Sequence, residues 1–169
     1  SATGTNAVAM GLNTTASGSR STAMGDSTTA SGNYSAAMGD SSTASGPAST
    51  AMGYNTTAIG ILSTAMGRST TASGYTSTAM GYDTTASGNY STAMGYFTTA
   101  SDYASVVIGQ FNSSGSSATS ATSFSTSNTA FVIGNGADSS NKSDAFKVMF
   151  NGDTTVSNDL TVSGDVVIS

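Results

Sequence analysis

The sequence lacks most of the side chains that catalysis and metal binding require. None of its 169 residues is Cys, His, Trp or Glu, and only one is Pro. Without His, Cys or Glu, few groups remain for acid–base chemistry, thiol chemistry or a zinc site, and disulfides are excluded. The composition therefore predicts a protein that is not an enzyme and that holds no cofactor and no metal.

Charge is also scarce. Four basic residues against nine Asp give a net charge of −5, which is too little positive charge for a nucleic-acid footprint. No apolar run approaches the roughly 18 residues of a membrane-spanning helix, so we expect no direct membrane insertion. Ser, Thr, Ala and Gly dominate the chain. Such a composition is close to that of disordered proteins, and the residue pattern must decide between disorder and order.

The pattern is a strict repeat. Gly recurs every seven residues from Gly4 to Gly95, Asp102 takes the next position, and Gly109 follows. Ala stands two residues before each of these positions, from Ala2 to Ala100, while Met and Ser alternate directly before Gly. The unit is therefore fourteen residues, close to S-T-A-M-G-x-x-T-T-A-S-G-x-x. One Gly per heptad costs about 1 kcal/mol in a helix, which excludes a coiled coil.

Read as strands, each heptad is a short extended segment followed by a turn, and two heptads close one coil. Coils stacked at roughly 4.8 Å form a parallel β-solenoid. Side chains alternate along a strand, so the residues two and four before Gly, always small, share one face. We place that face inside a thin roll, with the Met side chains on one outer wall and Thr and Ser on the other. The alternative, Met inside and Ala outside, needs a thicker roll.

An outward row of Met would be an apolar stripe of a kind that soluble monomers avoid. Burial against copies of the same stripe, around an axis parallel to the stack, would remove it from water for every coil. The residues that we expect at this axis are Met10, Met24, Met38, Met52, Met66, Met80, Met94 and Ile108.

Residues 1–112 resemble the head repeats of YadA-like trimeric autotransporter adhesins, whose hallmark is S-V-A-I-G followed by a weaker S-x-A-x-G half. The nearest match is Ser105-Val106-Val107-Ile108-Gly109, and Asn6 keeps the leading Asn of the motif. The resemblance implies a left-handed parallel β-roll that assembles as a homotrimer, with the Ile-type position at the three-fold axis. Handedness and the number three come from the resemblance alone.

The rest of the chain differs. Residues 113–129 are rich in Ser and Thr and predict an extended connector. Residues 130–169 predict a β-rich capping or neck segment and a fibre stalk: Ala130 to Gly134 repeats the V-I-G motif, residues 145–150 alternate like a strand, Asn151-Gly152 marks a turn, and short strands follow from Thr154 to Ser169. This part is similar to segments of phage tail fibres and bacterial surface fibres.

Aromatic residues gather in the predicted turns. Turns after the Met strand share one edge and turns after the other strand share the opposite edge; aromatics there either contact a receptor or cover the turns and neighbouring protomers. Ile59 stands at a position where the repeat has Ser. With it, Ile61 and Leu62 form either a patch that binds a ligand or a packing contact between protomers. The candidate contact residues are Tyr54, Tyr82, Tyr96, Phe97, Tyr34, Tyr75, Tyr90, Ile61 and Leu62.

Asp102 replaces Gly near the end of the repeat. We expect it to cap the roll, at a turn that the next coil no longer crowds. Asp tolerates the left-handed backbone region, and its carboxylate can accept hydrogen bonds from amides of an Asx-turn. Replacement of Asp102 by Gly should then have little effect.

The sequence predicts a fibre or adhesin segment that binds a surface or host receptor, protein or glycan, and that assembles with itself. We expect an extracellular location at a bacterial cell surface, in an outer-membrane-anchored fibre; the alternative is a virion tail fibre. Since the chain opens inside a repeat, we expect it to be part of something longer. A less favoured alternative is an ice-binding β-solenoid, suggested by the regular Thr-x-Ser rows.

Overall fold

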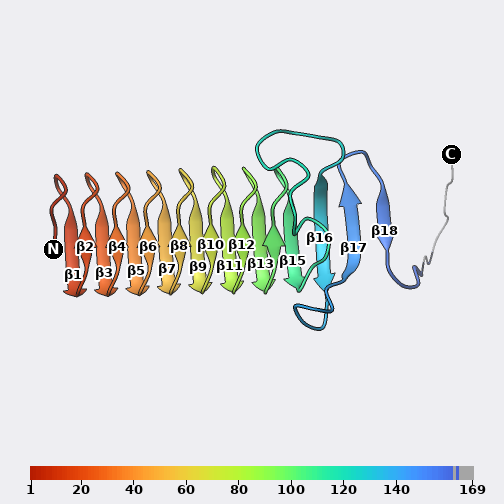
Figure 1. The fold of residues 1–169 in the computed structure, drawn as a ribbon, viewed down its shortest axis with the longest axis horizontal. Helices are drawn as coiled ribbons and strands as arrows, with labels where there is room; N and C mark the ends of the chain where they lie inside the picture. The colour runs from red at the N-terminus through yellow and green to blue at the C-terminus, as the bar shows by residue number, and fades with distance from the viewer. Residues whose placement is uncertain (162, 164–169) are drawn as a thin grey trace.

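The computed structural model describes residues 1–161 and 163, which are built from strands and turns without any helix. Each fourteen-residue unit contributes one strand of five residues and one of two residues (Figure 1). The five-residue strands are β1 (Val8–Leu12), β3 (Thr22–Asp26), β5 (Ala36–Asp40), β7 (Thr50–Tyr54), β9 (Thr64–Arg68), β11 (Thr78–Tyr82), β13 (Thr92–Tyr96) and β15 (Val106–Gln110). The two-residue strands are β2 (Thr15–Ala16), β4 (Thr29–Ala30), β6 (Thr43–Ala44), β8 (Thr57–Ala58), β10 (Thr71–Ala72), β12 (Thr85–Ala86) and β14 (Thr99–Ala100).

The two kinds of strand form two separate parallel sheets, so the chain is a parallel β-solenoid as the repeat predicts. Successive units pair in perfect register, with Met10 opposite Met24 and Ala9 opposite Ala23 in the long-strand sheet. Because the register never shifts from β1 to β15, each position of the repeat forms a straight column along the roll.

The long-strand sheet continues beyond the repeat. β16 (Thr129–Asn135) pairs parallel with β15 and places Ile133 opposite Ile108, as the second V-I-G motif predicts. β17 (Asp144–Met149) and β18 (Thr154–Val156) then add antiparallel strands, joined by a turn in which Gly152 has a φ of 93°. Part of the predicted strand content after β18 lies outside the described residues.

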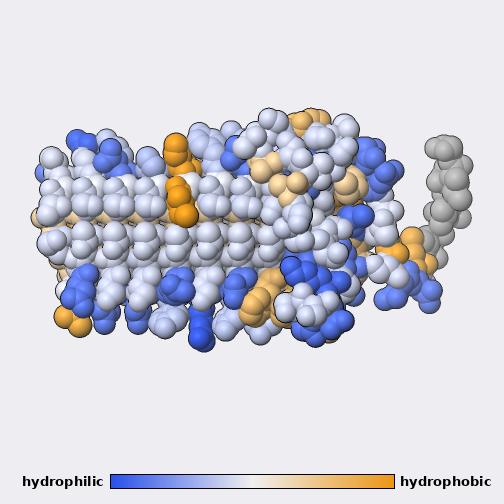
Figure 2. Space-filling model, viewed as in Figure 1, coloured by the Kyte–Doolittle hydropathy of each residue, from blue (hydrophilic) through white to orange (hydrophobic). Residues whose placement is uncertain are grey.

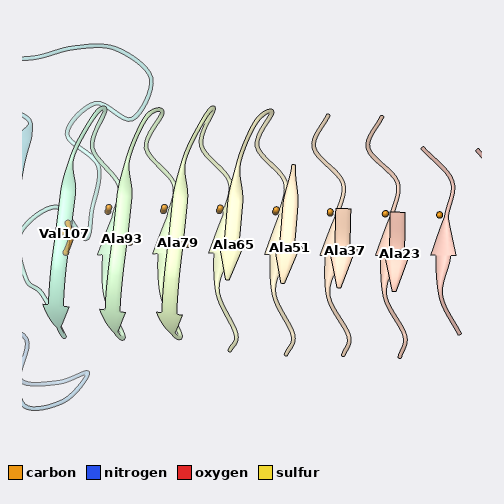
Figure 3. Packing of buried hydrophobic residues seen from close by; sticks show 14 of the residues in the cluster. Ala23, Ala37, Ala51, Ala65, Ala79, Ala93 and Val107 are labelled. Atoms are coloured by element: carbon orange, nitrogen blue, oxygen red, sulfur yellow. The ribbon is translucent and has the colours of Figure 1, made fainter. Parts of the chain in front are cut away.

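The interior of the roll is a column of small side chains. From Ala16 to Ala100 every seventh residue is Ala with no exposed surface, followed by Val107 and Val132 (Figure 3). The Ser and Thr positions four before each Gly are buried as well. The prediction that the small face lies inside is confirmed, and the alternative with Met inside is wrong. Since each buried Ala contributes far less than the roughly 1.5–3 kcal/mol of a buried Leu, the core of a single chain is thin.

Gly is needed because adjacent coils approach each other closely. A Cβ at Gly74 would lie 2.0 Å from the carbonyl oxygen of Gly88, and one at Gly81 would lie 2.0 Å from that of Gly95. Gly81, which follows Met, also has a φ of 125°, whereas positive φ values do not occur at the Gly positions that follow Ser. Close approach is therefore common to both Gly positions, and the left-handed backbone belongs to the Met-Gly position alone.

The turns hold a second left-handed position that the sequence analysis missed. The residue two after each Gly position has a φ between 42° and 61°, from Asn6 to Phe111, and none of these residues is Gly. Asn and Asp tolerate this region; the Asn residues at positions 6, 13 and 55 were the available signal.

Replacement of Ala48 by Gly is expected to raise the free energy of unfolding by about 0.5–1 kcal/mol, because Ala48 is exposed and has a φ of 54°. The matched control is Ala36→Gly in β5, where extended backbone should make the same change destabilising by about 0.5–1 kcal/mol. Chemical denaturation gives the free energy of unfolding of both variants. A loss of stability in both would contradict the left-handed conformation of Ala48.

The end of the roll is closed by the segment between β15 and β16. Instead of running extended as predicted, residues 113–128 fold back over the last coil: the Ser101 and Tyr103 N–H groups donate to the carbonyl oxygens of Gly115 and Ser120, each at 2.8 Å. Asp102 does cap the roll, but through distant amides. Its carboxylate accepts hydrogen bonds from the N–H groups of Thr119 at 2.6 Å and Thr129 at 2.8 Å.

The backbone conformation and the Asx-turn predicted for Asp102 are therefore wrong. Asp102 does not have a positive φ and forms no Asx-turn. Its side chain, 1 % exposed, occupies space that the next coil fills elsewhere in the roll.

Candidate assembly and attachment surfaces

The outer face of the long-strand sheet carries one column of apolar side chains, which we call the Met wall. In the repeat it consists of Met10, Met24, Met38, Met52, Met66, Met80, Met94 and Ile108. Its Met side chains point away from the Ala interior because neighbouring residues alternate across a strand. Met10 at the open end is 60 % exposed, and those from Met24 to Met94 are half-buried because each stacks against the next. The candidate axis residues thus form one continuous row in the order that the sequence predicts.

The Met wall does not stop with the repeat. Ile108 is followed in register by Ile133 of β16, Phe146 of β17 and Val156 of β18. The column beside it likewise passes from Thr92 through Val106 to Phe131 and Val148. Sequence analysis identified only the part up to Ile108, although the repeated V-I-G motif signals the next residue. One apolar wall therefore runs along both the roll and the strands that follow.

The outer face of the short-strand sheet carries columns of Thr and Ser. Thr57 pairs in register with Thr43 and Thr71, and the same column extends from Thr15 to Thr99. Ile59, 52 % exposed, breaks the Ser column, and Figure 2 shows an isolated apolar patch midway along the otherwise weakly polar roll. Ice binding by this wall stays a prediction that a thermal-hysteresis measurement would test.

The turns after Met-Gly form one edge of the roll, the Met-side edge. Here Tyr54, Arg68, Tyr82 and Tyr96 occupy equivalent positions in four successive coils. The Arg68 guanidinium lies 5.5 Å from the ring centre of Tyr54 and 5.1 Å from that of Tyr82. The rings of Tyr82 and Tyr96 stack at 5.2 Å. The structure thus brings together the candidate contact residues that the sequence assigned to this edge.

Phe97 and Phe111 extend the same cluster. Their rings stack at 4.9 Å, and Phe97 also lies 4.7 Å from the ring of Tyr96. Arg68 lies over the ring of Tyr82, and Tyr96 stacks against it. The row therefore ties successive turns together.

The turns after Ser-Gly form the opposite Ser-side edge. Tyr34 accepts a hydrogen bond at 2.9 Å from Arg20, and its ring is 60 % exposed. Further along, Tyr90 makes edge-to-face contacts with Tyr75 and Tyr103, both at 5.3 Å. Ile61 and Leu62 lie on this edge between these groups and are 47 % and 49 % exposed. Arg20 and the buried Asp102 are the charged residues in the turns of this edge, whereas the Met-side edge carries Asp26, Asp40, Arg68 and Asp83.

Neither a metal centre nor a membrane helix emerges within residues 1–161 and 163. No three Asp residues of this part lie close enough to hold a metal ion. The same part contains no helix long and apolar enough to cross a membrane.

Fold and surfaces together define an elongated repeat protein whose long sheet presents an apolar wall and whose turn edges carry aromatic rows. Four successive segments match the YadA head domain repeat, over residues 2–28, 30–56, 58–84 and 86–112. These matches cover more than half of the chain, which therefore belongs to the YadA head domain family. No curated protein matches it significantly.

Proposed function

We propose that this chain is a non-enzymatic segment of a trimeric surface fibre that mediates attachment. The observation that carries the proposal is the continuous Met wall. It runs from Met10 to Ile133 without a change of register and continues through Phe146 to Val156. Its residues would expose a long apolar stripe in a monomer. Three copies with their Met walls at a common axis would bury that stripe and add to the thin Ala core.

The attachment surfaces would be the two turn edges. They carry most of the exposed aromatic and aliphatic residues of the roll, and a stack of rigid coils fixes their spacing. Rigid presentation lowers the entropy cost of binding, since few side chains must be ordered. A protein or glycan receptor would contact Tyr side chains and Arg68 on the Met-side edge. On the Ser-side edge it would contact Tyr side chains together with Ile61 and Leu62.

The proposed location is the surface of a bacterial cell, with a virion fibre as the alternative. The support for a surface fibre is membership of the YadA head domain family, and the support for the alternative is the strand segment β16–β18, which resembles parts of tail fibres. The coding sequence downstream of residue 169 would separate the two: a membrane anchor supports the cell-surface fibre, and a self-cleaving chaperone domain supports the virion.

Attachment can be tested with beads that carry the purified chain, applied to cultured cells and to a glycan array. Tyr96→Ala on the Met-side edge and Tyr90→Ala on the Ser-side edge should leave the oligomer intact, and we expect at least one of them to weaken binding by about tenfold. Thr71→Ala on the Thr wall is the control and should bind like the unchanged chain. Wild-type binding by both Tyr variants would contradict attachment through the edges.

A further inference from the structure

An open hollow lies where the two-sheet roll ends. The short-strand sheet stops at β14, while the long-strand sheet continues through β16, β17 and β18. The hollow has a volume of about 420 Å³ and lies against β17 and β18 and the segments at residues 113 and 135–144. It is large enough for a single sugar ring and open enough for a longer chain to enter.

Lys147 of β17 lines this hollow from a position that is interior elsewhere. It pairs with Val132 of β16, which has no exposed surface and stands in the same column as Val107 and the interior Ala residues. Residues directly opposite each other in a pair of antiparallel strands point to the same face. The face that is apolar and closed in the roll thus becomes open here and carries an ammonium group.

Lys142 lies in the loop before β17 and also lines the hollow. Both Lys residues of the chain therefore line it. Within residues 1–161, neither ammonium group makes a hydrogen bond to protein. Asp144, also at the hollow, is already engaged: its carboxylate accepts hydrogen bonds from the N–H groups of Ser113 at 2.9 Å and Ser114 at 2.8 Å. Two positive groups and one engaged carboxylate leave the hollow net positive, on a chain whose net charge is −5.

The loop that carries Lys142 is held by Asp138. The Asn141 side-chain amide, together with the backbone N–H groups of Ser140 and Asn141, lowers the pKa of the Asp138 carboxyl. This carboxylate is therefore occupied within its own turn. Polar side chains of Asn135, Ser143, Thr155, Ser157 and Asn158 also line the hollow. The Ser143 hydroxyl donates to the Asn135 Oδ1 at 2.7 Å, and amides and hydroxyls of this kind can hydrogen-bond to sugar hydroxyls.

The hollow remains accessible in the proposed assembly. Lys147 lies on the face of β17 opposite to Phe146, which continues the Met wall. Burial of the Met wall at an axis would therefore turn the hollow outward, toward a surface to which the fibre attaches.

We propose that this hollow binds an acidic sugar, with Lys142 and Lys147 holding its carboxylate or sulfate group and the neighbouring amides and hydroxyls holding its ring hydroxyls. The proposal rests on the attachment function and gives it a ligand class. Charge-assisted hydrogen bonds are the strong ones among polar contacts, and a net positive hollow on an acidic chain selects anions against the general repulsion.

The test uses the full chain on an array of glycans that contain sialic acid, uronic acid or sulfated sugars, each beside its neutral counterpart. We expect acidic glycans to bind at least about tenfold more tightly than the neutral ones, with a preference that falls as salt is raised. Lys147→Gln and Lys142→Gln should each reduce this binding by about tenfold. Thr71→Asp, which lowers the net charge by the same unit on the outer face of the short-strand sheet, is the matched control and should bind acidic glycans unchanged. Thermal unfolding of all variants checks that the fold is intact.

Several outcomes would overturn the proposal: no preference for acidic glycans, unchanged binding by the two Lys variants, or equal loss in the Thr71→Asp variant. Competition by sodium sulfate as effective as that by glucuronate would show an anion site without sugar recognition, and would also overturn it. If the Lys variants still attach to cells like the unchanged chain, this site fails while the proposed function stands. If the unchanged chain attaches to no cell and no glycan, the proposed function fails too.

Discussion

Replacement of Met52 and Met66 by Asp is expected to abolish assembly. The two residues pair in register in the Met wall, so in a trimer each change would place three carboxylates in one apolar layer. An unpaired buried charge costs several kcal/mol after relaxation, and six of them exceed what a thin Ala core can offset. Light scattering should report a monomer or an unfolded chain where the unchanged protein gives a trimer.

The matched control places the same charge on the opposite wall. Thr57 and Thr71 also pair in register, on the outer face of the short-strand sheet, and Thr57→Asp with Thr71→Asp should leave the trimer assembled. A trimer of normal thermal stability with Asp at both Met positions would refute the axis assignment. A monomeric unchanged chain would refute the proposed assembly as a whole.

Replacement of Gly74 by Asp is expected to disrupt the roll more severely than any single change at its end. A Cβ there would lie 2.0 Å from the Gly88 carbonyl oxygen, a distance that backbone cannot accommodate without separating two coils. Asp102→Gly creates no steric clash, but it removes the carboxylate that accepts hydrogen bonds from the Thr119 and Thr129 N–H groups. Loss of two charge-assisted hydrogen bonds should cost a few kcal/mol.

Thermal unfolding of the two variants measures the difference. The sequence predicts a small effect for Asp102→Gly, but the structure leads us to expect a clear loss of stability, because the carboxylate is buried and accepts two backbone hydrogen bonds. We expect Gly74→Asp to prevent cooperative folding and Asp102→Gly to fold with a lower midpoint. Equal midpoints in the two variants would show that the mid-roll and terminal positions are equivalent, contrary to the structure.

The sequence alone was sufficient for the solenoid and for its inside and outside. A period of seven with Gly in every heptad excludes a helix, and Ala two residues before Gly can only stack at close spacing in a thin interior. The positions of Met24 and Thr29 on opposite outer walls follow from the same alternation. These features were predictable because each depends on local conformation and on identical neighbours one coil away.

Only the tertiary structure shows the contacts between the repeat and the non-repeating segments that follow it. Asp102 accepts hydrogen bonds from Thr119 and Thr129, which follow it by 17 and 27 positions in the chain. A repeat pattern does not predict that an irregular connector covers the end of a roll. Likewise, the continuation of the Met wall into Phe146 depends on an antiparallel strand pairing with a register shift. The hollow at Lys147 exists because one sheet ends before the other, which is a property of the assembled fold. Local periodicity fixes the coils, whereas contacts between non-repeating segments depend on how the whole chain packs.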